Sequence, residues 1–194
     1  MSPSNIGIYA SQISGHLFAP SGAYDSIATV TVGSGGAADI TFSSIPATYT
    51  HLQIRILAKT ALTLSNQDGI NVQYNGATGS SYNYHYVGGN GSVTYSGGNA
   101  SATTFMQSIS IAGTLSNANV FGAGVIDILD YANTNKYKVQ RALGGADNNG
   151  SGIVEMWSGL YTATTAISSI KLYSFNSSNF VQYSSFALYG IKGA

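Results

Sequence analysis

Cysteine is absent from the 194 residues of this chain. Its absence excludes disulfide bonds, thiolate nucleophiles and cysteine-ligated zinc. No apolar run approaches the roughly 18 residues that a membrane span requires. The N-terminus also lacks a basic region followed by an apolar one. We therefore expect no signal peptide and no membrane partner.

The chain is also poor in charged residues. Charged residues make up 7% of the chain, and seven basic and seven acidic groups cancel to a formal net charge of zero. An average domain carries roughly 25%. Phosphate binding requires clustered Lys and Arg, which are scattered here, so we expect no nucleic-acid partner. Solitary soluble domains usually carry net charge. A neutral surface rich in Ser, Asn, Gly and Tyr therefore predicts that neighbouring protein subunits cover much of the surface.

The patterns of a catalytic or metal site are missing as well. There is no Gly-x-Ser-x-Gly elbow. Asp127 and Asp130, the nearest pair of carboxylates, stand three residues apart along an expected strand, which points them to opposite faces. The segment 147–151 resembles part of a calcium loop but lacks a later Glu at the required spacing. We therefore predict no enzyme activity, no metal and no cofactor.

Polar and apolar residues alternate along most of the chain. Within 51–57, for example, Leu52, Ile54 and Ile56 share one face, which is typical of a strand with one buried side. About ten short segments of this kind are separated by Gly- and Asn-rich turns, and none has a helical period. In the second half, the expected strands are 105–112, 120–131, 137–143, 153–161, 167–175 and 181–191. The pattern predicts a single all-β domain over 21–194, an antiparallel β-sandwich, with a jelly roll as the expected arrangement.

The turn at Asn133 allows a finer prediction. A hairpin in which paired residue numbers sum to 268 aligns three favourable pairs at once. Each such pair contributes about 0.2–1 kcal/mol. The pairs are Asp127 with Arg141, Asp130 with Lys138, and Tyr131 with Tyr137.

Residues 1–20 differ from the rest of the chain. They lie between Pro3 and Pro20 and show no clear alternation, so we expect an extended N-terminal arm. An alternative is a first strand of the domain's own sheet. Exposed apolar side chains are costly in water, so the arm should dock on its own domain or on a neighbour. Its expected anchors are Ile6, Ile8, Ile13, Leu17 and Phe18.

The stretch 75–102 is rich in Gly, Ser, Asn and Tyr and is too long for an ordinary connection. It should therefore be functional or contain an irregular hairpin. Tyr82, Tyr84 and Tyr86 alternate, so their rings should share one face of a local strand. This composition is typical of adaptable recognition surfaces, which leaves a subunit interface, a receptor or glycan contact, or neither. The predicted binding residues are Tyr74, Tyr82, Tyr84, His85, Tyr86 and Tyr95.

Three segments carry a resemblance to a known family. YDSIATVTVGSGGAADITFSSIPATYTHLQIRILAKT, GVIDILDYANTNKYKVQRALGG and VQYSSFALYGIKG are similar to a family of tailed-bacteriophage virion proteins, and the likeness spans most of 24–193. The resemblance implies a β-sandwich displayed on a virus particle after synthesis in the host cytoplasm. It concerns a scaffold and identifies no site residues.

Two functional classes follow as expectations. The first is a capsid decoration, or cement, protein that stabilises the capsid exterior. The second is a tail fibre or spike protein that binds a receptor or a host surface glycan. In either case we expect a homo-oligomer, most simply a homotrimer, whose other partners are the major capsid protein or further virion proteins.

Overall fold

The computed structural model describes residues 23–193. The predicted arm, with its anchors Ile6, Ile8, Ile13, Leu17 and Phe18, lies outside the described residues. Within the described part, no helix is long and apolar enough to cross a membrane.

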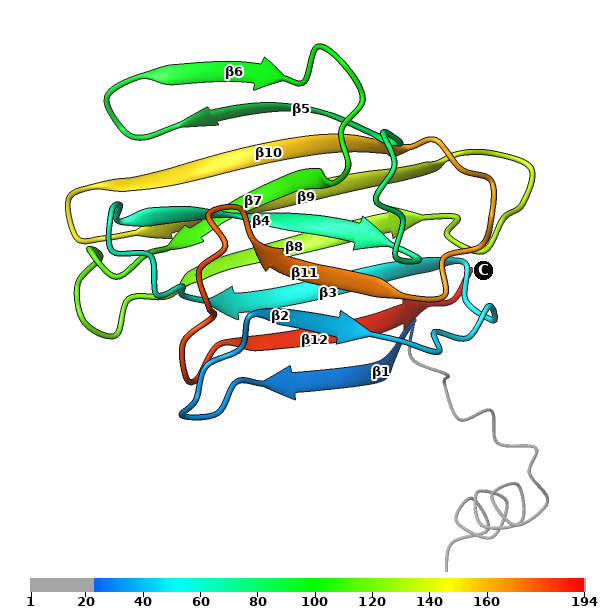
Figure 1. The fold of residues 1–194 in the computed structure, drawn as a ribbon, viewed down its shortest axis with the longest axis horizontal. Coiled ribbons are helices and arrows are strands. Elements are labelled where there is room, and N and C mark those ends of the chain that lie inside the picture. The colour runs from blue at the N-terminus through cyan, green and yellow to red at the C-terminus, as the bar shows by residue number, and fades with distance from the viewer. Residues whose placement is uncertain (1–22, 194) are drawn as a thin grey trace, which may run out of the picture.

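The structure is all-β, and its strands form two antiparallel sheets packed as a sandwich (Figure 1). The large sheet has eight strands in the order β1-β12-β3-β8-β9-β10-β5-β6, and the small sheet has four in the order β2-β11-β4-β7. The strands are β1 (Tyr24–Thr31), β2 (Asp39–Phe42), β3 (His51–Ala58), β4 (Gln67–Tyr74), β5 (Tyr82–Gly89), β6 (Thr94–Gly98), β7 (Met106–Ala112), β8 (Gly122–Leu129), β9 (Lys138–Asp147), β10 (Gly152–Tyr161), β11 (Ile170–Ser174) and β12 (Ser185–Ile191).

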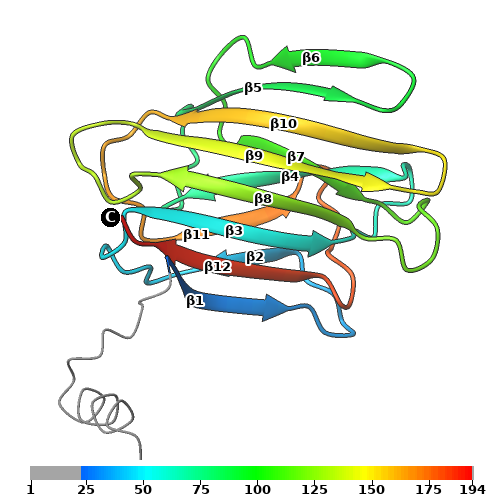
Figure 2. The same cartoon turned by 180° about the vertical axis from the view of Figure 1, so that it is seen from behind.

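The strand order is compatible with a jelly roll. When the hairpins β5–β6 and β9–β10 are set aside, two four-stranded sheets remain, β1-β12-β3-β8 and β2-β11-β4-β7. Of the seven connections between these eight strands, six cross from one sheet to the other, and the one from β4 to β7 returns to the small sheet. The two hairpins widen only the large sheet, and we call their strands β9, β10, β5 and β6 the wing. Figures 1 and 2 show β5 and β6 extending beyond β7, the edge of the small sheet.

The core lies between the two sheets and follows the predicted alternation. Leu52, Ile54 and Ile56 of β3 all point inward, as expected, and so do Ile70 and Val72 of β4. Inward residues of β7, β8, β11 and β12 complete one continuous cluster. Burying side chains of this size stabilises the fold by about 1.5–3 kcal/mol each, so the alternation decides which face of each strand turns inward.

The register of the hairpin between β8 and β9 is confirmed. Asp127 pairs with Arg141, and the ladder continues to Leu129 opposite Val139, so the paired numbers sum to 268. The two pairs nearest the turn are not formed, because β8 ends at Leu129 and Asp130 turns away with a φ of 49°.

The side chains that were expected to pair near this turn have other partners. The carboxylate of Asp130 binds Lys136 instead of Lys138. The ammonium group of Lys138 is buried and donates hydrogen bonds to the carbonyl oxygens of Asn133, Lys136 and Thr164. Burial, followed by the nearby charge of Lys136, lowers the pKa of Lys138. The lysine thus stabilises the turn from inside.

Several strand boundaries differ from the prediction. Gly144 and Gly145 were expected in a turn, but they belong to β9, which continues to Asp147. A Cβ atom on Gly144 would lie 2.7 Å from the Cβ atom of Ile109, so glycine allows β7 to pack closely over β9. In contrast, 181–184 is not a strand, and Tyr183 there has a φ of 72°. At Gly144, glycine therefore marks a place where two strands pack closely, and not the end of a strand.

Candidate binding surfaces of the wing

The stretch 75–102 contains a hairpin, β5–β6, at the free edge of the large sheet. The rings of Tyr82, Tyr84 and Tyr86 share one face of β5, as predicted, and this is the inner face. They lie opposite Tyr161, Gly159 and Trp157 of β10. The predicted binding residues are therefore close together, but most of them point towards the inside of the sandwich.

Tyr74 and Tyr82 belong to the core, so their prediction as contact residues is wrong. Both are fully buried. The hydroxyl of Tyr74 donates to Gln140 at 2.5 Å, and the hydroxyl of Tyr82 donates to the carbonyl oxygen of Ala77 at 3.1 Å. Tyr82 also stacks on Tyr161, with ring centroids 4.9 Å apart. Because a hydrogen-bond partner inside the protein satisfies each hydroxyl, both rings can be buried without loss.

Farther out along the hairpin, three of the tyrosines gather around Trp157. Tyr86 stacks on the indole at a centroid distance of 4.3 Å, Tyr84 lies 5.7 Å from it, and Tyr95 of β6 meets Tyr86 edge-on at 6.1 Å. Burial, followed by the neighbouring charge of Tyr86, raises the pKa of Tyr84. The rings of this aromatic cluster are mostly in contact with one another. Trp157 is absent from the predicted set because it lies some seventy residues along the chain from the hairpin, although its strand was correctly expected.

The carboxylate of Glu155 connects the hairpin to the rest of the molecule. It accepts hydrogen bonds from the Tyr95 hydroxyl at 3.0 Å, from the Trp157 indole N–H at 3.1 Å and from the backbone N–H of Ser110 at 3.2 Å. These donors stand on β6, β10 and β7, so one buried side chain joins both sheets. Burial, together with the charge of Glu155, raises the pKa of Tyr95 well above its usual range.

Beside Glu155 lies a polar cavity of about 400 Å³ at the open end between the sheets. Tyr86, Tyr95, Gln107 and Asn176 contribute to its lining. Amide and hydroxyl groups next to aromatic rings can hydrogen-bond and stack on a small polar ligand such as a sugar. The arrangement is therefore suited to binding, and it was not foreseen from the sequence.

Replacing Glu155 with alanine is expected to loosen the hairpin more than the core. The indole N–H of Trp157 and the N–H of Ser110 would lose their acceptor, at a cost of about 1–3 kcal/mol. We expect amide hydrogen exchange in β6 to become at least tenfold faster, with much smaller changes in β3. Tyr95→Phe, which removes one contact only, should have a weaker effect. An equal acceleration in all strands would contradict a local role for Glu155.

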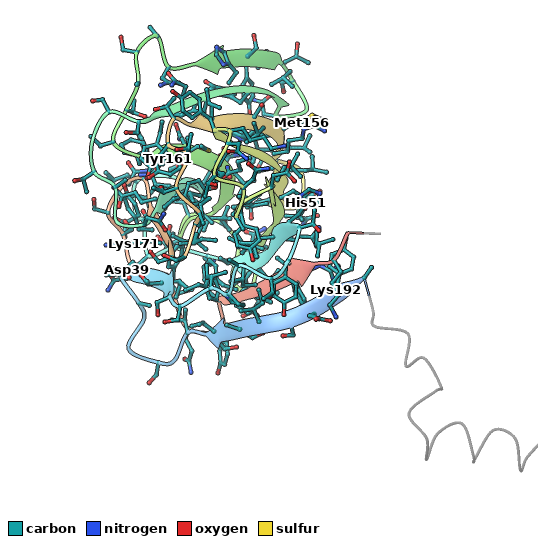
Figure 3. All side chains as sticks on the ribbon, turned by 90° about the vertical axis from the view of Figure 1, so that its right-hand side faces the viewer. Asp39, His51, Met156, Tyr161, Lys171 and Lys192 are labelled. Carbon is teal, nitrogen blue, oxygen red and sulfur yellow. The ribbon has the colours of Figure 1, made fainter. Side chains whose placement is uncertain are left out.

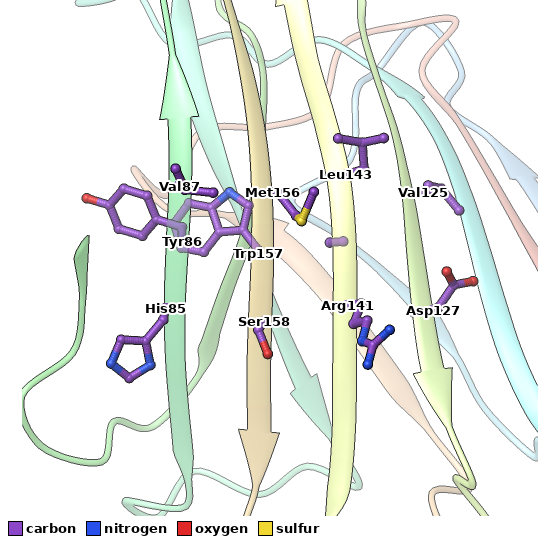
Figure 4. Close-up of a pocket in the computed structure, with 11 residues that line it drawn as sticks. His85, Tyr86, Val87, Val125, Asp127, Arg141, Leu143, Met156, Trp157 and Ser158 are labelled. Carbon is purple, nitrogen blue, oxygen red and sulfur yellow. The ribbon is translucent and has the colours of Figure 1, made fainter. Parts of the chain in front are cut away.

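The opposite face of the wing carries a row of apolar side chains. His85 lies there, because neighbouring residues of a strand point to opposite faces, so it is separated from the tyrosines with which it was grouped. Val87, Met156, Leu143 and Val125 form one continuous row across β5, β10, β9 and β8. A shallow pocket of about 550 Å³ lies over this row, and Figure 4 shows its side chains on adjacent strands.

The candidate metal ligands in the described part of the chain are its His, Asp and Glu side chains. Among residues 23–193, no group of three or more His, Asp or Glu side chains could hold a metal ion. His51 accepts a hydrogen bond from the backbone N–H of Asp130 at 2.9 Å, and its ring lies 3.4 Å from the Asp130 carboxylate. The histidine thus closes the end of β8.

Comparisons with protein-family models, with curated proteins and with solved structures find no match to this chain. The resemblance to tailed-bacteriophage virion proteins therefore stays a prediction, and the functional argument rests on the two faces of the wing.

Proposed function

We propose that the protein is a structural component of a bacteriophage particle, a capsid decoration protein that stabilises the capsid exterior, and that it has no enzymatic activity. The resemblance of three segments to virion proteins supports this proposal, as does the scarcity of charge. The proposed partners are further copies of the same chain, as a homotrimer, and the major capsid protein. Its place is the particle surface.

One observation carries this proposal furthest. The outer face of the large sheet exposes a row of apolar side chains where a solitary sandwich would present polar ones. Large contiguous apolar patches on a protein surface mark sites of contact with other molecules. A neutral protein with such a face is suited to permanent assembly rather than to free diffusion.

Localisation on the particle tests the proposal. Virus particles that encode the chain would be purified, analysed by mass spectrometry and labelled with a gold-conjugated antibody. Label over the capsid is expected. Label confined to the tail would support the alternative function, and absence of the protein from purified particles would overturn both. Deletion of residues 2–20 should reduce occupancy on the particles if the arm contributes to anchoring.

A receptor- or glycan-binding tail protein is the second candidate. The polar cavity beside the aromatic cluster favours it, because sugars are bound by hydrogen bonds together with ring stacking. Trp157 is the only tryptophan of the chain and lines this cavity, so its fluorescence reports on binding directly. Titration with host surface oligosaccharides should shift the emission if this function holds. A spectrum unchanged by all of them would leave the decoration role as the proposal.

A further inference from the structure

The outer face of the wing has features of a contact surface. Met156 is 59% exposed, and its cross-strand neighbours Val87 and Leu143 are 53% and 49% exposed. Val154, two residues along β10 from Met156, is as exposed as Met156. These side chains, with Val125 of β8, form the outer patch, which crosses four adjacent strands. The next outward residues along these strands are polar, and they are His85, Ser158, Arg141 and Asp127.

The low charge of the whole chain does not explain this patch. The outer face of the small sheet carries charged and polar side chains beside an aromatic group of Phe105, Tyr173 and Phe175. Thr41 and Gln73 point outward there, and Asp39 forms an ion pair with Lys171 at 3.2 Å. Figure 3 shows Met156 on one side of the sandwich and Asp39 and Lys171 on the other. The outer face of the small sheet thus mixes charged, polar and aromatic side chains, whereas the outer patch is one continuous row of apolar side chains.

We propose that the outer patch is the surface through which identical copies of this chain pack against one another. The proposal deepens the self-association suggested above and rests on it. It assigns the contact to the outer face of β5, β8, β9 and β10, and not to the tyrosines of the inner face. Because those tyrosines pack against Trp157 and the core, they are not available to a partner, whereas the outer patch is.

The size of the face fits a second copy. The large sheet is eight strands wide, and most of its strands have seven to ten residues. At about 4.8 Å between strands and about 3.3 Å per residue, the face measures roughly 1,000 Å². A standard protein interface buries about 800 Å² of each partner. The four strands of the patch make up roughly 600 Å² of this face. A contact of standard size is therefore centred on the patch and extends onto the neighbouring strands of the same face, which has the room for it.

The charges on the face fit the same occupant. Arg141 and Asp127 border the patch on neighbouring strands, and within residues 23–193 they form no ion pair with each other or with another residue. Asp127 accepts a hydrogen bond from Gln53 at 2.8 Å. One positive and one negative group suit a partner with the same pair. Because the chain has no net charge, two copies approach without overall repulsion.

Met156→Lys tests the proposal, with Leu64→Lys as the matched control. Leu64 is 87% exposed on the loop between β3 and β4 and lies outside the patch. Light scattering and sedimentation over a wide concentration range would give the dissociation constant of each protein, and circular dichroism would confirm that both variants fold. We expect Met156→Lys to weaken self-association at least tenfold and Leu64→Lys to leave it nearly unchanged. Leu143→Asp should act like Met156→Lys.

Other outcomes would distinguish failure of the outer patch as the contact from failure of self-association itself. An oligomer that Met156→Lys and Leu143→Asp leave intact would refute the patch as the contact but not self-association. A wild-type protein that stays monomeric at every concentration would refute both. If deletion of residues 2–20 alone dissolves the oligomer, the N-terminal segment makes the contact, and a face formed by the sheet alone is wrong.

Discussion

Replacing Asp68 with alanine is expected to lower the free energy of unfolding by about 3–5 kcal/mol. Asp68 stands on β4 and is almost fully buried. Its carboxylate accepts hydrogen bonds from the hydroxyls of Thr60 at 2.8 Å and Ser174 at 2.7 Å, and from the side-chain amide of Asn176 at 2.9 Å. Alanine would leave the buried hydroxyls of Thr60 and Ser174, and the more exposed side-chain amide of Asn176, without their acceptor.

The position of Asp68 makes the effect large. Thr60 follows β3 of the large sheet, whereas Ser174 ends β11 of the small one, so the carboxylate joins segments that are far apart in the chain. Urea denaturation would measure the loss. Asp39→Ala is the matched control, because Asp39 is a partly exposed carboxylate with a surface ion pair to Lys171 and should cost less than about 1 kcal/mol. Equal losses for the two variants would show that the buried hydrogen bonds do not matter.

Raising the pH above 10 is expected to unfold the protein cooperatively. Burial raises the pKa of Tyr74 well above its usual value and that of Tyr82 to about 12, and it also raises the pKa of Tyr161. In the unfolded chain these phenols lose their protons near pH 10. Between pH 10 and 12 the folded state therefore holds more protons than the unfolded state, and stability falls as pH rises.

Urea midpoints measured at successive pH values would check this. The buried tyrosines should leave the urea midpoint nearly constant from pH 8 to 10. Between pH 10 and 12 the midpoint should fall steeply. Tyr161→Phe removes one of the raised groups and should make the drop shallower. The three rings pack in one cluster, with the ring centroids of Tyr74 and Tyr161 5.5 Å apart. Their ionisation should therefore coincide with loss of the far-ultraviolet circular dichroism signal. Full tyrosinate absorbance in a still-folded protein below pH 11 would contradict the expectation.

The sequence alone determined the class of the fold and much of its local pairing. Alternation of apolar residues, as in Leu52, Ile54 and Ile56, depends only on the two-residue period of a strand, so it can be read without knowing the neighbours. The register of β8 and β9 could likewise be predicted, because a hairpin joins residues that are close in the chain and opposite charges favour one alignment.

For β5, whose two faces both carry aromatic or apolar side chains, only the tertiary structure decided which side lies inside. The two-residue period places Tyr82, Tyr84 and Tyr86 on one face, but it does not say whether that face lies inside. Strand β7 of the small sheet contacts β5, and this packing decides that the rings lie on the inner face. Trp157 and Glu155 joined them from a strand seventy residues away. The outer patch has the same origin, because Val87, Leu143 and Met156 become neighbours only when β5, β9 and β10 lie side by side. Strand order is set by packing over long sequence distances, and no local pattern encodes it.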